Sequence, residues 1–158
     1  MRGRATFKKR KTEPDKIYGS ILVTKFINRM MRDGKKSVAE KAFYDALSKI
    51  EEKEQGALEI FEKAIQNVGP NQEIKARRVG GASYQIPQEV RGDRKVSLAI
   101  RWILAAARNR PNTEFRTFAD KLAAELKAAV NNEGEAVKKR DTIHRMAEAN
   151  KAFSHFRI

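Results

Sequence analysis

The chain has 158 residues, 41% of them hydrophobic, so it can bury one core and is too apolar to be a disordered tail. It has no cysteine, which excludes disulfides, thiolate zinc sites and cysteine nucleophiles. Its 34 Lys and Arg against 20 Asp and Glu give a formal charge of +14. Because like charges oppose compaction, this surplus indicates a polyanionic partner, most commonly nucleic acid.

A membrane partner is disfavoured by the same composition. The basic N-terminus lacks the apolar segment of a secretory signal, and no terminal helix with an exposed apolar face is predicted. The most apolar stretch, 96–107, is interrupted by Arg101 and is too short to span a bilayer. We therefore expect a cytoplasmic protein with no membrane contact.

Residues 1–16 form a basic extension. They hold seven bases against two acids and one bulky apolar side chain, Phe7, so they cannot join a core. We predict that they precede a helical domain at 17–158 and become ordered in a groove of RNA, the alternative being a solvated tail without function.

Three helices are predicted between residues 20 and 68. Apolar side chains recur every three to four positions, as Phe26, Phe43 and Phe61 illustrate. Gly34 is expected to end the first helix, Ser37 to open the second with a capping box, and the pair at 69–70 (Gly-Pro) to end the third.

The stretch 72–91 predicts a β-hairpin, with two short strands around Gly80 and Gly81. Pro87 should lie on an edge strand because it cannot donate to a ladder. At about 3.3 Å per residue each strand could reach roughly 20 Å. The hairpin either lies flat on the helices or projects as a basic arm, on which Tyr84 could stack on an unpaired base.

Three more helices follow the hairpin. Their expected N-caps are Asp93, Thr113 and Asn132, and the last helix fades near Asn150. Trp102, beside the apolar stripe of the fourth helix, is expected at the edge of the core. The predicted fold is mainly α, a single domain of about six helices with a protruding two-stranded hairpin between the third and fourth.

The residues give no support for catalysis, a metal or a cofactor. Gly34 and the two lysines after it lack the upstream glycine of a phosphate loop, although a helix start with two lysines suits a backbone phosphate. His144 and His155 have no zinc-ligand spacing. An RNA-modifying enzyme is therefore disfavoured, and a DNA-bending protein with a β-arm is the leading alternative to an RNA-binding protein.

Four stretches carry a resemblance that covers nearly the whole chain: DGKKS at 33–37, KARRVGGASYQIP at 75–87, VKKRD at 137–141 and HRMAEANKAF at 144–153. In this order and spacing they resemble the bacterial small-subunit ribosomal protein number seven family. The chain departs from the family's pattern at Lys16, Gln88, the 110–115 linker and Ile158.

The resemblance implies a structural protein that binds the 3′ major domain of 16S rRNA and nucleates assembly of the subunit head. It further implies a position near the decoding centre and the tRNA exit site, where the hairpin reaches toward tRNA and mRNA. The C-terminal helix and tail are expected to contact neighbouring small-subunit proteins, notably number eleven. No small-molecule substrate is implied.

Charge and resemblance together select three sets of residues. The expected rRNA contacts are Arg2, Arg4, Lys8, Lys9, Arg10, Lys11, Lys25, Lys35, Lys36, Arg94, Lys95, Arg101, Arg108, Lys138, Lys139 and Arg140. The expected hairpin contacts with RNA or tRNA are Lys75, Arg77, Arg78, Gly80, Gly81 and Tyr84. The expected contacts with a protein partner are His144, Asn150, Phe153 and Phe156.

Overall fold

The computed structural model describes residues 12–50 and 56–156. Along this part of the chain six α-helices, one short 3₁₀ helix and one hairpin follow one another. They are α1 (Ile21–Met30), α2 (Lys36–Ile50), α3 (Ala57–Val68), β1 (Gln72–Val79), β2 (Ala82–Glu89), α4 (Gly92–Asn109), α5 (Phe118–Val130), α6 (Gly134–Ala149) and η1 (Lys151–Phe156). The predicted order and class of elements are confirmed, and η1 is an element that the sequence did not predict.

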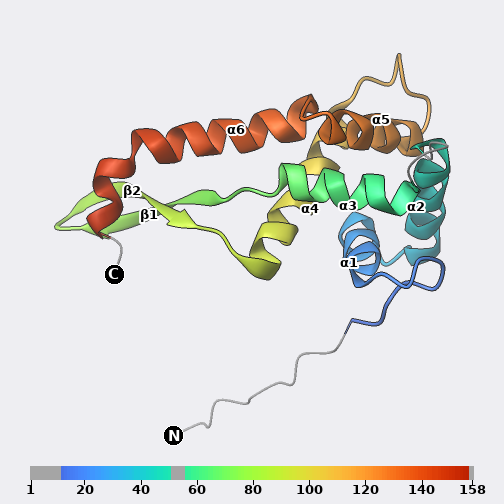
Figure 1. Cartoon of the computed structure of the whole chain (residues 1–158), viewed down its shortest axis with the longest axis horizontal. Helices are drawn as coiled ribbons and strands as arrows, with labels where there is room; N and C mark the ends of the chain where they lie inside the picture. The colour runs from blue at the N-terminus through green and yellow to red at the C-terminus, as the bar shows by residue number, and fades with distance from the viewer. Residues whose placement is uncertain (1–11, 51–55, 157–158) are drawn as a thin grey trace, which may run out of the picture.

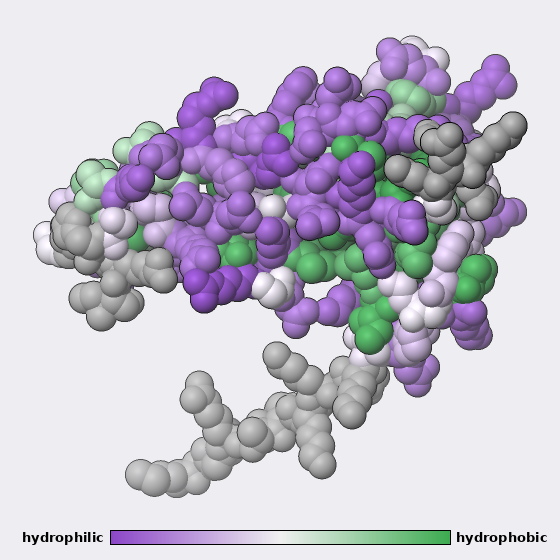
Figure 2. Space-filling model, in the orientation of Figure 1, coloured by the Kyte–Doolittle hydropathy of each residue, from purple (hydrophilic) through white to green (hydrophobic). Residues whose placement is uncertain are grey.

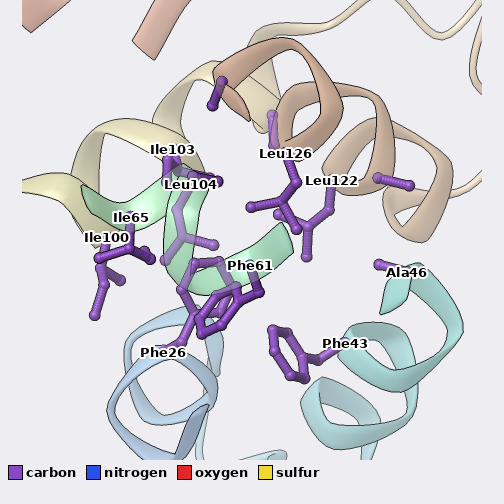
Figure 3. Packing of buried hydrophobic residues seen from close by; sticks show 14 of the residues in the cluster. Phe26, Phe43, Ala46, Phe61, Ile65, Ile100, Ile103, Leu104, Leu122 and Leu126 are labelled. Atoms are coloured by element: carbon purple, nitrogen blue, oxygen red, sulfur yellow. The ribbon is translucent and has the colours of Figure 1, made fainter. Parts of the chain in front are cut away.

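Helices α1 to α5, with the first turn of α6, pack around one core (Figures 1 and 3). At its centre the fully buried rings of Phe26, Phe43 and Phe61 lie 5.2 to 5.3 Å apart, centroid to centroid. Two of the three pairs meet edge to face, an arrangement that aromatic quadrupoles favour. Because each ring comes from a different helix, the cluster fixes α1, α2 and α3 relative to one another.

The hairpin projects beyond this body, as predicted (Figure 1). Val79 pairs with Ala82, so the turn has two residues, and both Gly80 and Gly81 have positive φ, at 57° and 91°. A type I′ turn needs positive φ at both positions, which glycine adopts without steric cost.

The hairpin is not a free arm, however. Helix α6 runs from the helical body along β1, and η1 packs against β2 (Figure 1). Ile86 and Pro87 are buried as a result. Both predicted arrangements are therefore confirmed in part. The hairpin projects from α1–α5, but it also lies against a helix of its own chain. A two-stranded ribbon alone is only marginally stable, which explains why it is supported in this way.

The helix boundaries correct several predicted caps. Helix α1 ends at Met30, so Gly34 (φ 72°) belongs to the following turn, and α2 begins one residue before Ser37. Asp93 lies in the first turn of α4, where it pairs with Lys25 and does not cap the helix.

The cap of α5 is Thr117 and not Thr113. Its hydroxyl accepts from the backbone N–H of Asp120, and the Asp120 carboxylate accepts from the N–H of Thr117. Glu133 and not Asn132 precedes α6, and Asn132 instead adopts a positive φ of 58°. The predicted caps failed because their spacing also occurs by chance in a polar loop, where only the backbone conformation decides which residue precedes the helix.

Candidate RNA-binding surface

The root of the hairpin is a junction at Asn71 that joins four segments of the chain. Its backbone N–H donates to Nε2 of His144 on α6 at 3.0 Å, and its side-chain oxygen accepts from Nζ of Lys95 on α4 at 2.8 Å. Its carbonyl accepts from the N–H of Val90, just after β2, at 2.9 Å. The direction of the hairpin is therefore set by both α4 and α6.

An ion pair between a glutamate and an arginine reinforces the root of the hairpin. Glu73 on β1, buried to 8% exposure, accepts two hydrogen bonds from Nε of Arg94 and one from Nη2, at 2.6 to 2.8 Å. Lys75 lies 3.3 Å from the same carboxylate. These hydrogen bonds, Arg94 first, hold the pKa of Glu73 below its usual value, although burial acts to raise it. Two predicted phosphate contacts, Arg94 and Lys75, thus already have an anionic partner.

Three of the four residues predicted to contact a protein partner also make contacts that hold the hairpin. His144 accepts from Asn71, the amide of Asn150 donates to Gln85 on β2 at 3.5 Å, and Phe153 packs against Tyr84 with ring centroids 5.4 Å apart. Tyr84, predicted to stack on a base, is half-buried in that contact. The side chain of Phe156 lies outside the described residues.

Other predicted cations are paired within the helical body. Lys25 pairs with Asp93 at 2.6 Å, Lys138 pairs with Glu135 at 2.7 Å, and Arg140 donates to the carbonyl of Asn67 and to Asp141. Because these groups are exposed or half-exposed, they still add positive potential to the surface.

The side chain of Arg108 lies against the end of α1. Its Nη2 is 3.3 Å from the carbonyl of Met30. Burial, and then the charge of Arg32, hold the pKa of the Arg108 guanidinium below its usual value. Two cations thus lie close together at the end of α1.

The side chains of several exposed cations make no hydrogen bond or ion pair with another described residue. Lys35, Arg101 and Lys139 are among those predicted, whereas Lys36 forms an ion pair with Glu40 at 3.6 Å. Near the turn, Arg77 and Arg78 are also exposed, but they do not belong to this group, because both have interactions within the chain; Nε of Arg78 donates to the carbonyl of Gly81 at 3.4 Å. Arg2, Arg4 and Lys8 to Lys11 lie outside the described residues.

Further exposed cations of this kind were missed, among them Arg29, Arg32, Arg116 and Arg145. A signal for one of them existed, because Arg29 follows Lys25 by four residues and therefore lies on the same face of α1. On the face drawn in Figure 2, hydrophilic side chains cover most of the surface, with patches of hydrophobic surface between them.

Within residues 12–50 and 56–156, no cluster of His, Cys, Asp and Glu could hold a metal ion. No helix in that part of the chain is both long and apolar enough to cross a bilayer.

A helical protein with a supported β-arm, and with unpaired cations on several of its helices and loops, has the features of a nucleic-acid-binding protein. Comparison with known proteins places it more closely. Residues 2–151 match the profile of the family "Ribosomal protein S7p/S5e", and the chain belongs to that family.

Individual relatives support the same family. The chain is 58% identical over 150 residues to the small ribosomal subunit protein uS7 of Nitratiruptor sp., covering 94% of both chains. It is 52% identical over 158 residues to uS7 of Afipia carboxidovorans, covering 99% of both, and 55% identical over 150 residues to uS7 of Nitratidesulfovibrio vulgaris, covering 94% of both. The chain is therefore a structural component of the small ribosomal subunit that associates with rRNA and ribosomal proteins, and not an enzyme.

Proposed function

We propose that this protein binds the 3′ major domain of 16S rRNA and nucleates assembly of the subunit head. The observation that carries the proposal is the placement of cations that the fold leaves unpaired. They lie in the α1–α2 loop (Arg32, Lys35), on α4 (Arg101) and on α6 (Lys139, Arg145). A rigid body with cations on several elements can neutralise phosphates of several RNA segments and hold them at fixed angles.

The hairpin is the part that we assign to the tRNA exit site, near the decoding centre, with contacts to tRNA and mRNA. Lys75, Arg77 and Arg78 are exposed on β1, and Gly80 and Gly81 allow a backbone phosphate to approach the turn closely. Its root is held by two helices, so the arm is presented in one direction. The turn lacks the apolar or proline wedge that a DNA-bending arm inserts between base steps.

We assign the C-terminal segment to a neighbouring small-subunit protein, number eleven. His144, Asn150 and Phe153 take part in this contact indirectly, because they fix α6 and η1 against the hairpin. Exposed side chains of η1, such as Lys151 and Ser154, are then available to the partner.

Competition binding tests the proposal against its rival. Labelled 3′ major domain of 16S rRNA is bound at near-physiological salt, and unlabelled 5′ domain RNA or duplex DNA of equal length competes. The proposal predicts that neither competitor displaces the label at concentrations where unlabelled 3′ domain does. Equal displacement by duplex DNA would instead support the DNA-bending protein.

A further inference from the structure

An apolar groove opens between the end of α1, the start of α2 and the start of α5. Its floor is formed by Met30, Met31, Val38 and Phe118, and its volume is about 350 Å³. Val38 is 64% exposed, although it is a large apolar side chain on a helix. The α1–α2 groove, as we call it, is therefore apolar surface that the fold leaves uncovered.

The rim of the α1–α2 groove is cationic. Arg32, Lys35 and Arg108 line it, and no carboxylate is among the described residues that do so. The side chains of Arg32 and Lys35 have no hydrogen-bonding or ion-pair partner among the described residues. Arg108 reaches the carbonyl of Met30 and lies close enough to Arg32 for the two charges to repel.

Three cations without a counter-anion around an apolar floor suit a ligand that has both an anionic and an apolar part. A nucleotide combines an apolar ring with a phosphate, and unpaired RNA bases commonly stack on apolar or aromatic side chains while basic groups hold the backbone. A double-stranded segment does not fit, because its bases are stacked inside the helix. An acidic protein segment that also carries apolar side chains would match both rim and floor, but membership of a family that associates with rRNA favours the nucleotide.

We propose that the α1–α2 groove binds one unpaired nucleotide of RNA, with its base against Met31, Val38 and Phe118 and its phosphates on Arg32, Lys35 and Arg108. This inference rests on the proposed binding of rRNA and adds the nature of one contact. The groove thereby selects for a bulged or looped nucleotide, in addition to attracting the RNA backbone.

The test uses Val38→Ser in the full chain, with Ile21→Ser as the matched control. Ile21 is likewise an exposed aliphatic residue, at 49% exposure, but it lies at the opposite end of α1 from Met30. Serine and β-branched residues have similar helix propensity, so both variants should have the same melting temperature as the wild type. Affinity for the 3′ major domain is measured over a range of salt concentrations, together with base-specific chemical footprinting.

Loss of a base contact should lower affinity about tenfold for Val38→Ser and expose one unpaired nucleotide, without changing the slope of log affinity against log salt. Arg32→Gln should instead reduce that slope by about one. Ile21→Ser should bind as the wild type does.

Equal affinities for Val38→Ser and Ile21→Ser would overturn the inference while leaving rRNA binding intact. It would also be overturned if Val38→Ser bound naked RNA normally but lost a neighbouring protein from reconstituted subunits, since the groove would then be a protein contact. Failure of the wild type to bind the RNA would overturn the proposed function itself.

Discussion

The N–H of Asn71 donates to Nε2 of His144 at 3.0 Å, and this bond joins the residue before β1 to the middle of α6. The two residues are 73 positions apart in sequence. Together with the hydrogen bond from Lys95 to Asn71, the contact determines where the hairpin leaves the helical body.

Replacement of His144 by alanine should loosen the hairpin root. The Asn71 N–H would lose its acceptor, at a cost of about 1 kcal/mol. We expect faster amide hydrogen exchange at Asn71 and Val90, with little change in the core helices. Arg145→Ala, one residue further and exposed, serves as the control, and equal exchange in both variants would show that His144 does not hold the root.

The imidazole of His144 should also make the stability of the fold depend on pH. Burial, followed by the charge of Arg140 and then that of Lys95, holds the pKa of His144 below its ordinary value of 6.5, while Asp141 acts in the opposite direction. The unfolded chain therefore takes up this proton at a higher pH than the folded one. Stability should be unaffected by this group above about pH 6.5 and should decline as the pH falls below it.

Denaturant unfolding at pH 7.5 and pH 5.5 measures this effect. The wild type should lose more of its free energy of unfolding between the two pH values than His144→Gln does, because glutamine does not titrate. Identical losses would mean that His144 carries no part of the pH dependence.

A buried carboxylate joins α5 to the start of α6. Glu125 is fully buried, forms an ion pair with Arg110 at 2.8 Å and accepts from the N–H of Ala136 at 3.0 Å. Glu125→Gln should cost roughly 3 kcal/mol, because it leaves Arg110 without its counter-charge in a mostly buried site. Glu135→Gln, which removes an exposed pair with Lys138, should cost less than about 1 kcal/mol in the same thermal melts.

Charge reversal of the hairpin should separate function from folding. The double variant Arg77→Glu with Arg78→Glu lowers the net charge of the hairpin by four units. Because the hairpin lies outside the core, the melting temperature should change little. Binding of exit-site tRNA to reconstituted subunits should fall by more than tenfold. The double variant Lys41→Glu with Lys63→Glu changes the charge equally at exposed helix positions and should have a smaller effect. Equal loss of thermal stability and RNA binding in the hairpin variant would contradict the assignment.

Removal of residues 1–11 should weaken rRNA binding and reduce its salt dependence, since six basic residues are lost. The helical circular dichroism should persist, because the first helix begins at Ile21. An unfolded product would refute the division of the chain into a basic extension and a helical domain.

Much of the fold could be predicted from local sequence, because the apolar stripes and the Gly80–Gly81 turn are local signals. Phe26, Phe43 and Phe61 were all placed on buried faces. The end of α3 at Gly69 was predicted correctly, but the N-cap of α5 could not be, since Thr117 and Thr113 are both suitable residues and only the path of the chain after α4 selects Thr117.

The candidate site was predicted less well, for a physical reason. Charge identifies a cation, but its partner is often far away in sequence, as with Lys25 and Asp93, 68 positions apart, or Arg94 and Glu73, 21 apart. Sequence alone therefore could not separate cations that stabilise the fold from those, such as Arg32 and Lys35, that remain available to RNA. Nor could it show that Tyr84 and Phe153 pack on each other.

Hydroxyl-radical footprinting of this protein on naked full-length 16S rRNA tests the central claim most directly. We predict protection confined to the 3′ major domain, spread over several segments and lost as salt is raised. Absence of protection there at near-physiological salt, or equal protection of the other domains, would contradict the account.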